Sequence, residues 1–413
     1  MVGSGAREHA IASSLKASGV DIHAHMERRN PGIAKLAQKV SIGPLNDVLK
    51  LSDLIGMDYG VIGPEAALAS GYTDFLMNQG IPCVGPTKAA AMIETSKSFA
   101  RRLLQNTYPN ANPRFVIARS LDEYREFVKK VGLENIVVKP DGLTGGKGVK
   151  IFGEHLHSQD DVEKYVSSEL WNKGVVVLEE KLIGLEFTVQ AFVDGNRLVT
   201  MPLVRDYKRA FDQDKGPNTG SMGSYSKEDH NLDYVTDGDL VNAKLIMQTT
   251  VEQIKKNTKS EYKGILYGQF IKTESGIKVI EYNARFGDPE AMNVLSILRT
   301  PMDEICRNII DGNLGTIEFE KKATVCVYVV PEGYPGPDVV KDSPIDMSVA
   351  SSAKIYFASV YELDGQVLTT GSRAVSVLGK GDTVAQAREI AYTNSSHIKG
   401  KVRYRTDIAK DVS

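Results

Sequence analysis

The sequence predicts a multidomain protein that combines α/β and α+β architecture. The chain has 413 residues, which is more than a single hydrophobic core usually accommodates. In its N-terminal part, short apolar strands that end in glycine turns alternate with helix-like stretches, a pattern typical of βαβ units and a parallel sheet. The C-terminal part is instead rich in β-branched and aromatic residues, which favours a separate, mostly β domain.

Composition places the chain among ordinary globular proteins. Hydrophobic residues make up 42% and charged residues 25% of the sequence, so disorder is not expected. The net charge of −2, from 50 basic and 52 acidic side chains, argues against a protein whose overall field binds nucleic acid. Cys83, Cys306 and Cys326 have no paired spacing, so we expect a reducing compartment. With neither a signal peptide nor an apolar membrane span, the sequence predicts a cytoplasmic protein.

The N-terminal part begins with a glycine turn that leads into a helix. Residues 3–9 read Gly-Ser-Gly-Ala-Arg-Glu-His, and apolar residues recur after the turn at helical spacing. The apolar strand that normally precedes such a turn is missing or very short. A second helix is expected after residues 30–32, and strands at 59–63 and 81–86 each end in a tight turn.

From about residue 95 the pattern changes to capped helices and longer strands. Ser120 with Glu123, and Ser158 with Asp161, are capping-box pairs that predict two helix starts. The strands expected in this part lie at residues 136–140, 175–180, 187–193, 265–272 and 277–282. Beyond them we expect a strand at 323–330, a hairpin at 360–368 and a helix at 383–392.

A glycine-rich segment between two strands is predicted to hold phosphate. Residues 141–149 lead from one strand into another, so they form a hairpin and not the helix-linked loop of P-loop proteins. Lys139 ends the first strand, and Lys147 lies in the turn, where a mobile loop brings its charge to a phosphate. The alternative is a surface hairpin with incidental lysines.

The strand at 277–282 runs into the most polar motif of the chain. Alternation on a strand places Glu281, Asn283 and Arg285 on one face. A carboxylate and an amide oxygen at this spacing suit Mg²⁺, which takes its other ligands from water and phosphate. Arg285 beside them would neutralise charge on a transferring phosphoryl group. A salt-bridged strand edge is the alternative, but it does not account for polar residues that follow an apolar strand.

Three further segments carry weaker signals. The turn at 3–5 lets backbone N–H groups approach a phosphate, although the third glycine of a dinucleotide-binding fingerprint is missing, which argues against a dehydrogenase. Residues 179–186 place several acidic residues at a strand end, which an ordinary strand edge also explains. The loop 206–223 is long, polar and dotted with glycine; it suits a small zwitterion and a sugar phosphate, or it is a disordered excursion.

Taken in order along the chain, these motifs resemble those of the glycinamide ribonucleotide synthetase family, which belongs to the ATP-grasp enzymes. The resemblance extends over essentially the whole chain. The run Arg-Phe-Gly-Asp-Pro-Glu at 285–290 is the most specific motif, whereas the glycine hairpin is shared with ATP-grasp enzymes generally. The motifs that carry the resemblance lie at residues 3–9, 63–66, 139–149, 216–223 and 285–290.

The resemblance implies that ATP drives the ligation of glycine to 5-phosphoribosylamine through glycyl phosphate, the second step of purine biosynthesis, with Mg²⁺ or Mn²⁺ as cofactor. It also implies a Rossmann-like N-terminal domain at 1–113, an ATP-grasp lid at 114–182, an ATP-grasp central domain at 183–320 and a small, mostly β C-terminal domain at 321–413. We expect a monomer that binds these small molecules and neither nucleic acid nor a membrane.

Carried over motif by motif, the resemblance assigns roles to single residues of this sequence. Catalytic roles are assigned to Arg285, Lys147 and Asp288. Contacts with ATP are assigned to Lys97, Lys139, Gly145, Gly146, Lys147, Glu179, Glu180, Leu182 and Glu186. Contacts with glycine and the amine are assigned to Gly5, Arg7, Glu8, Gly63, Pro64, Glu65, Asp206, Lys208, Pro217, Asn218, Thr219, Gly220, Met222 and Arg285. The metal is assigned to Glu281 and Asn283.

Three positions depart from the family pattern. Arg101 stands where relatives usually have lysine, and Ser221 stands where they often have glycine. Gln269 lies where some ATP-grasp relatives have a second metal carboxylate. Another ATP-grasp enzyme, such as a formate-using transformylase or a carboxylase, would keep the nucleotide site and change the acid. A nucleotide-binding regulatory module without catalysis is the alternative from a different class.

Overall fold

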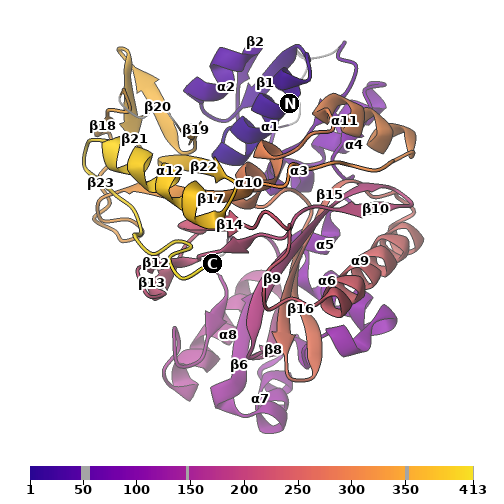
Figure 1. Cartoon of the computed structure of the whole chain (residues 1–413). Helices are drawn as coiled ribbons and strands as arrows, with labels where there is room; N and C mark the ends of the chain where they lie inside the picture. The colour runs from indigo at the N-terminus through magenta and orange to yellow at the C-terminus, as the bar shows by residue number, and fades with distance from the viewer. Residues whose placement is uncertain (48–55, 146–147, 349–352, 413) are drawn as a thin grey trace.

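The computed structural model describes residues 1–47, 56–145, 148–348 and 353–412. The N-terminal part and the C-terminal β-structure lie together at one end of the molecule, and a smaller lobe formed by α7 (Leu121–Val131), α8 (Gln159–Lys173) and the strands around them lies at the other (Figure 1). The strands of a central sheet run between the two ends. This mixture of parallel, antiparallel and helical parts confirms the predicted fold class.

The N-terminal part is built on parallel strand pairs. Val2 forms parallel bridges with both Ile62 and His25, so this one buried residue links the two parallel strand pairs. The helix expected after residue 30 forms as well, because the Asn30 side chain accepts hydrogen bonds from the first turn of α2. The elements are α1 (Ala6–Ala17), β1 (Ile22–Met26), α2 (Pro31–Leu36), β2 (Ala37–Ile42), β3 (Gly60–Val61), α3 (Glu65–Ser70), α4 (Tyr72–Asn78), β4 (Cys83–Val84), α5 (Met92–Thr95) and α6 (Lys97–Thr107).

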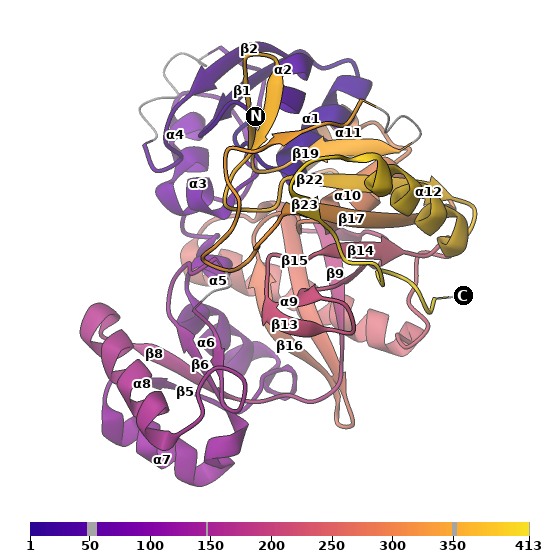
Figure 2. The same cartoon turned by 90° about the vertical axis from the view of Figure 1, so that its left-hand side faces the viewer.

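The smaller lobe is an antiparallel sheet with the order β5-β8-β6-β7, covered on one face by two helices. It stands apart from the rest of the molecule in Figure 2. Ser158 and Asp161 form the predicted capping box of α8. Only half of the other predicted box forms, because the Glu123 carboxylate accepts from the Arg119 N–H and not from the cap residue. The elements are β5 (Phe115–Ala118), α7 (Leu121–Val131), β6 (Ile136–Pro140), β7 (Lys150–Ile151), α8 (Gln159–Lys173) and β8 (Val176–Glu180).

The central sheet is antiparallel with the order β10-β9-β15-β16. Its last pair is irregular: Gln269 pairs with Glu281 and Phe270 pairs with Val279, so Ile280 between them has no partner across the ladder. This arrangement is a β-bulge, which bends a strand and redirects its polar groups. The elements around this sheet are β9 (Leu185–Asp194), β10 (Leu198–Thr200), α9 (Asp237–Thr258), β15 (Lys263–Thr273), β16 (Gly276–Asn283), α10 (Glu290–Ser296) and α11 (Met302–Asp311).

Half of the segment expected as a loop at 206–223 is β-structure. It contains the hairpin β12 (Arg209–Phe211) and β13 (Lys215–Asn218), and its two ends contribute β11 (Arg205–Asp206) and β14 (Gly223–Ser226) to the C-terminal sheet. The prediction of an irregular loop was therefore wrong for half of this segment. The glycine-rich composition does not predict these strands. They form because β14 pairs with a long, buried strand of the C-terminal part.

The C-terminal sheet has the order β11-β14-β17-β22-β19, and β23 also pairs with β17. The hairpin predicted at 360–368 forms, with Asp364 and Gly365 both at positive φ in its turn. No helix in the described part of the chain has the length and apolar character that a membrane crossing requires. The elements are β17 (Ala323–Pro331), β18 (Pro344–Ile345), β19 (Lys354–Phe357), β20 (Val360–Leu363), β21 (Gln366–Thr369), β22 (Val375–Gly381), α12 (Val384–His397) and β23 (Val402–Arg403).

Gly379 on β22 allows α12 to pack directly on the backbone of the strand. A Cβ atom at this position would lie 2.7 Å from the Ala391 backbone nitrogen and closer still to the Ala387 carbonyl oxygen. We expect Gly379→Ala to lower the free energy of unfolding by about 1–3 kcal/mol, because the helix must move outward. Gly315→Ala is the matched control, since a Cβ there has no neighbour within 4 Å. Equal urea-unfolding midpoints for the two variants would contradict the close-packing argument.

Candidate active site

One face of the central sheet carries polar side chains on three neighbouring strands. Side chains two residues apart on a strand share a face, and so do partners directly opposite each other. The ladders between β9, β15 and β16 therefore place one set of polar residues together, as the alternation in the sequence predicted for the last strand. The set consists of Glu186, Thr188 and Gln190 on β9, Tyr267 and Gln269 on β15, and Glu281 and Asn283 on β16.

Glu281 and Asn283 provide oxygen atoms that suit a divalent cation. Among the described residues, Glu281 has no hydrogen-bond or ion-pair partner, and its side chain is half-buried. The Asn283 amide oxygen accepts from Arg285 Nη2 at 3.0 Å and retains a second lone pair. The Gln269 amide is already engaged, because its nitrogen donates to Glu186 at 2.6 Å. The donor set therefore fits Mg²⁺ bound by two protein ligands and phosphate oxygens.

Glu179 is buried where the smaller lobe meets the central sheet. Its two carboxylate oxygens form a bidentate pair with Arg101 at 2.7 and 2.8 Å, and Lys139 Nζ lies 2.8 Å from the second oxygen. Burial alone would raise the pKa of Glu179, but the two cations outweigh it and lower the pKa below the ordinary value. The planar guanidinium of Arg101 supplies the fork of this bidentate pair.

The β-bulge on β16 gives the same cations a backbone acceptor. The Ile280 carbonyl accepts from Arg101 Nη2 at 2.6 Å and from Lys139 Nζ at 3.1 Å, and the Val279 carbonyl accepts from Arg101 Nη1 at 2.9 Å. Successive carbonyl groups of a regular strand point in opposite directions, so one guanidinium reaches both only because the strand is bulged. The predicted phosphate lysine Lys139 is thereby held against the strand that carries Glu281.

The glycine hairpin is attached to the start of α6. Lys97 Nζ donates to the Gly142 carbonyl at 2.8 Å, and the Asp141 carboxylate accepts from the Ser98 hydroxyl at 2.6 Å. Burial lowers the pKa of Lys97, which Glu281 opposes and the charge of Lys139 reinforces. Lys97 and Lys139, which are both predicted to contact ATP, therefore lie close together at this hairpin. Gly145 is in the left-handed conformation, and Gly146 and Lys147 lie outside the described residues.

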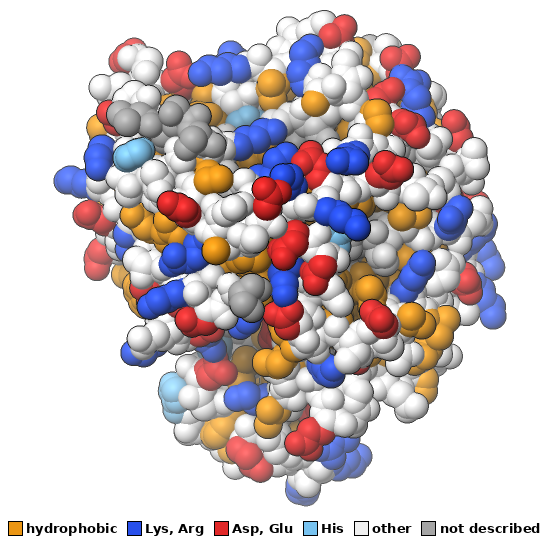
Figure 3. All heavy atoms as spheres, in the orientation of Figure 1, with side chains coloured by type: hydrophobic (Ala, Val, Ile, Leu, Met, Phe, Trp, Pro, Cys, Tyr) orange, Lys and Arg blue, Asp and Glu red, His pale blue; other side chains and the backbone are white. Residues whose placement is uncertain are grey.

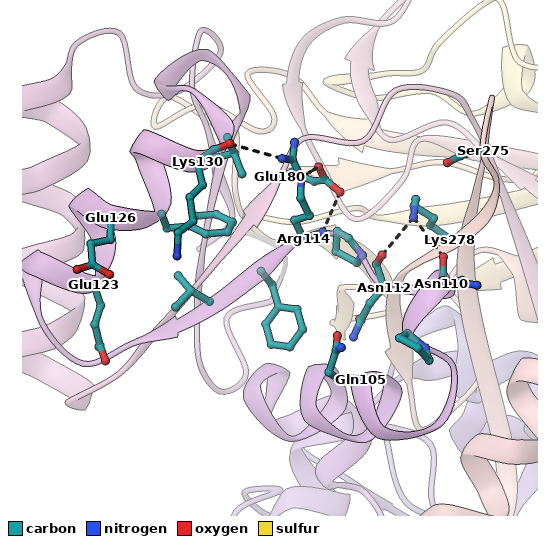
Figure 4. A pocket seen from close by; sticks show the side chains of 16 residues that line it. Gln105, Asn110, Asn112, Arg114, Glu123, Glu126, Lys130, Glu180, Ser275 and Lys278 are labelled. Atoms are coloured by element: carbon teal, nitrogen blue, oxygen red, sulfur yellow. Dashed lines mark hydrogen bonds and ion pairs between the residues drawn. The ribbon is translucent and has the colours of Figure 1, made fainter.

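Glu179 and Glu180 point to opposite faces of the lobe sheet, as neighbours on a strand do. The Glu180 carboxylate accepts from the backbone and the guanidinium of Arg114, in a hollow of about 970 Å³ beside α7 (Figure 4). This hollow lies on the helix-covered side of the sheet, away from Glu179 and Lys139. A contact of Glu180 with a nucleotide would therefore use its backbone, as would a contact of Leu182 in the link to β9.

The glycines of the N-terminal turn make room for the Glu8 side chain. A Cβ atom at Gly3 would lie 2.9 Å from Glu8 Cδ, and one at Gly63 would lie 2.6 Å from its Oε1 atom. The other carboxylate oxygen accepts from the Gly5 N–H at 2.7 Å, and Arg7 Nε donates to Glu8 at 2.6 Å. The predicted substrate residues of the two turns, at 3–8 and 63–65, are therefore one packed unit. Pro64 and Glu65 begin α3 beside it.

Arg285 lies between two acidic side chains. Its Nε atom is 3.1 Å from Glu65 and its Nη2 atom is 3.0 Å from Glu94. Arg285 and Arg7 each donate to the carbonyl oxygen of Phe286 at 3.1 Å. The two arginines thus share acceptors and lie close together, and each is also paired with carboxyl groups that fix its orientation.

Sequence reasoning missed Glu94. Its second oxygen accepts from the Ala284 N–H at 2.7 Å, so this carboxylate holds both the backbone and the side chain of the run that begins at Arg285. Burial raises the pKa of Glu94 to about 7, although Arg285 opposes the shift. For Glu65 the order is reversed: Arg285 and Arg7 outweigh burial and lower the pKa to about 2. A lone acid in an otherwise apolar stretch was the only signal for Glu94.

A second acidic group lies further along the same face. Tyr267 donates to Glu290 at 2.8 Å and accepts from the Thr188 hydroxyl at 2.9 Å. Burial and the nearby carboxylate of Asp206 raise the pKa of Glu290 to about 7. Lys208 Nζ lies 3.3 Å from Glu186. These contacts bring the predicted residues Asp206, Lys208 and Glu186 to one place and add Glu290, which had no assigned role.

The predicted residues at 217–222 divide into two groups. Pro217 and Asn218 lie on β13 and are exposed, whereas Met222 is fully buried. Thr219 is held back against Lys208, because its hydroxyl and its N–H both donate to the Lys208 carbonyl at 2.8 Å. On the face shown in Figure 3, acidic and basic side chains alternate, and neither charge covers a wide area. On this face, charge is therefore balanced locally and not gathered into a broad patch.

His9, the last residue of the N-terminal motif, joins α1 to the C-terminal sheet. Its Nδ1 atom accepts from the Phe357 N–H at 3.0 Å, and its ring lies against Gly32, where a Cβ would overlap it. Asn30 donates to the carbonyl groups of Ser4 and Phe357 at 2.9 and 2.8 Å. These hydrogen bonds therefore hold the N-terminal turn against the C-terminal part of the chain.

Comparison with known proteins finds one family along the whole chain. The description "Phosphoribosylglycinamide synthetase, N domain" matches residues 1–94, "ATP-grasp (A) domain" matches 95–291 and "C domain" matches 324–411. A phosphoribosylamine–glycine ligase of Methanosarcina barkeri is 45% identical over 99% of this chain and 95% of its own length. The ligase of Methanoregula boonei is 46% identical, also over 99% and 95%.

Solved structures are similar over the same length. The phosphoribosylamine–glycine ligase of Thermotoga maritima has a TM-score of 0.84 and 30% sequence identity, and the match covers 99% of both chains. A biotin carboxylase of Campylobacter jejuni, in complex with an ATP analogue, has a TM-score of 0.72 over 98% of this chain and 92% of its own. Its 11% sequence identity makes this a likeness of fold alone.

The buried His9 predicts a loss of stability in acid. Burial lowers the pKa of His9 to about 4, so folding favours the neutral ring, and this stability is complete above the ordinary pKa of 6.5 and lost as pH falls toward 4. We expect His9→Asn, whose amide oxygen can accept the same hydrogen bond, to remove up to about 3 kcal/mol of this acid dependence from the free energy of unfolding. Urea unfolding across this pH range measures it, with the exposed His157→Asn as control. Equal pH dependence in wild type and His9→Asn would contradict the assignment.

Proposed function

Because this chain belongs to the phosphoribosylglycinamide synthetase family, we propose that it ligates glycine to 5-phosphoribosylamine in a reaction driven by ATP. The observation that carries the proposal is the convergence of two kinds of group on one sheet face. Lys97 and Lys139 come from the nucleotide side, and Glu281 and Asn283 come from the strand that leads to Arg285. Phosphate charge and a divalent cation can therefore meet beside Arg285.

The chemistry requires an activated acid, because a carboxylate does not react with an amine in water. We propose that a carboxylate oxygen of glycine attacks the γ-phosphorus of ATP, which releases ADP and forms glycyl phosphate. The nitrogen of phosphoribosylamine then attacks the acyl carbon, phosphate leaves and the amine loses a proton. No protein nucleophile is needed, so the residues of this chain contribute orientation and charge.

The nucleotide side of the site has residues for each part of ATP. Lys97 and Lys139 offset phosphate charge, and the hairpin at 141–149 with Gly145, Gly146 and Lys147 covers the phosphates and keeps water from the intermediate. The backbone from Glu179 to Leu182 frames the adenine, and Glu186 accepts from the ribose hydroxyls. Mg²⁺ held by Glu281 and Asn283 would supply further neutralisation of the transferring phosphate.

The substrate side consists of groups whose positions are fixed by contacts with Arg7, Arg285 and the C-terminal sheet. Arg285 stabilises the acyl phosphate oxygens, and Asp288 orients the attacking amine. The turns at 5–8 and 63–65 form the sugar-phosphate side, and the segment 206–222 closes the glycine side. We retain the division into domains at 1–113, 114–182, 183–320 and 321–413 as part of this proposal. The cytoplasmic location and the monomeric state stay predictions.

The first test is the dependence of ADP release on the substrates. With ATP, Mg²⁺ and freshly generated phosphoribosylamine, we expect ADP release only when glycine is supplied, and product formation equal to ADP. Release with glycine but without the amine, at the same rate, would contradict ligation. Turnover with formate or bicarbonate in place of glycine would overturn the substrate assignment, although ATP would still be consumed.

The second test concerns Glu281. We expect Glu281→Ala to lower kcat by about a hundredfold, because the phosphoryl transfer loses charge stabilisation of several kcal/mol. Glu274→Ala, which removes an exposed carboxylate from the turn of the same hairpin, is the matched control and should leave kcat unchanged. Titration of both variants with Mg²⁺ measures the effect. Near wild-type turnover of Glu281→Ala at saturating Mg²⁺ would contradict the role of this carboxylate.

A further inference from the structure

Arg373 connects the two segments that form the substrate side of the site. It lies in the loop between β21 and β22 of the C-terminal sheet. Its Nη1 atom donates to the carbonyl oxygens of Gly220, of Ser221 at 3.0 Å and of Asp288 at 3.3 Å. Its Nη2 atom lies 3.2 Å from the Asp288 carboxylate. One guanidinium thus binds the segment that ends at β14 and the run that begins at Arg285.

The C-terminal sheet holds this guanidinium firmly. Arg373 Cζ lies 4.1 Å from the centre of the Tyr328 ring, on which the guanidinium stacks. The Tyr328 hydroxyl donates to the other oxygen of the Asp288 carboxylate. Only 14% of the Arg373 side chain is exposed, so the charge is paired in a largely dry environment. Both oxygens of Asp288 are therefore fixed by side chains from the C-terminal part.

The backbone that Arg373 holds is strained. Ser221 has a φ of +85°, in the left-handed region that favours glycine and costs other residues about 1–2 kcal/mol. The Ser221 hydroxyl donates to the Gly223 carbonyl at 2.9 Å, which offsets part of this cost. At Gly220 a Cβ would lie 3.0 Å from Arg373 Cζ, so the guanidinium fits only because this residue has no side chain. The conformation at 220–221 thus depends on contacts with Arg373.

We propose that Arg373 is a positioning residue for the two amine-bearing substrates, glycine and phosphoribosylamine. It does not touch the reacting atoms; it orients the Asp288 carboxylate and the backbone at 220–221, which face those substrates. This inference rests on the proposed function of both segments. It makes the C-terminal part of the chain a component of the active site, because one guanidinium of that part contacts both segments.

Replacement of Arg373 tests the inference through separate Michaelis constants. Arg373→Lys keeps the charge but cannot serve several acceptors from one plane. We expect it to raise the KM of glycine or of phosphoribosylamine by about tenfold or more and to leave the KM of ATP within about twofold, because Arg373 contacts neither Lys97 nor Lys139, the lysines assigned to ATP. Gly220→Ala, which displaces the guanidinium, should shift the same constants in the same direction.

Arg388 offers a matched control. Its guanidinium stacks on Tyr392 at 4.3 Å and donates to the carbonyl oxygens of Ile408 and Thr406 at 3.0 and 2.7 Å, so it has the same kind of contacts in the same part of the chain. Arg388→Lys should leave all three Michaelis constants unchanged. Amide hydrogen exchange gives a second readout that needs no turnover: Arg373→Gln should speed exchange at residues 220–222, and Arg388→Gln should not.

Two results would overturn the inference. The first is unchanged KM values for glycine and phosphoribosylamine in Arg373→Lys together with unchanged exchange in Arg373→Gln. The second is a uniform rise of all three constants with a lowered melting temperature, which would assign Arg373 to general stability. Wild-type protein that releases no ADP with glycine and the amine would instead overturn the proposed function. The exchange experiment then still decides whether Arg373 orders the segment.

Discussion

The two halves of the site, one on the smaller lobe and one on the central sheet, depend on the ion pairs of the buried Glu179 carboxylate. Two cations from different elements, Arg101 on α6 and Lys139 on β6, neutralise it, and both also bind the bulged backbone at Ile280. An unpaired charge at this depth would be strongly destabilising, so the three groups must be present together. Their meeting point joins the lobe sheet, the helix and the central sheet, and it places Lys139, which we propose to bind phosphate, beside the strand of Glu281.

On the proposed substrate side, charged side chains are also paired with opposite charges, and their partners come from distant parts of the chain. Arg285 is held by Glu65 and Glu94 from the N-terminal part, and Asp288 is held by Arg373 and Tyr328 from the C-terminal part. Arg285 and Asp288, to which we assign catalytic roles, are thereby oriented before any substrate binds. Preorganised charge of this kind avoids reorganisation during the reaction, which is where the largest part of enzymatic rate acceleration usually arises.

Local patterns in the sequence predicted the elements that carry the site. Strand alternation placed Glu281 and Asn283 on one face, and two strands around glycines predicted the hairpin after Lys139. The bulge at Ile280 could not be predicted, because it depends on the register with another strand. Glu94 and Arg373 have partners about 190 and 85 residues away, at Arg285 and Asp288, and no spacing along the chain reveals such contacts. The β-structure within 206–223 was missed for the same reason.

The most direct test of the whole account follows oxygen from glycine to phosphate. If the carboxylate of glycine attacks ATP, glycine labelled with ¹⁸O in its carboxyl group must transfer one of its two oxygens to inorganic phosphate for each product molecule. Mass spectrometry of the phosphate from a single incubation with ATP, Mg²⁺ and phosphoribosylamine measures this transfer. Phosphate with one labelled oxygen per turnover is the predicted result. Unlabelled phosphate released together with the ligated product would contradict a glycyl phosphate intermediate and the arrangement of charges that we assign to it.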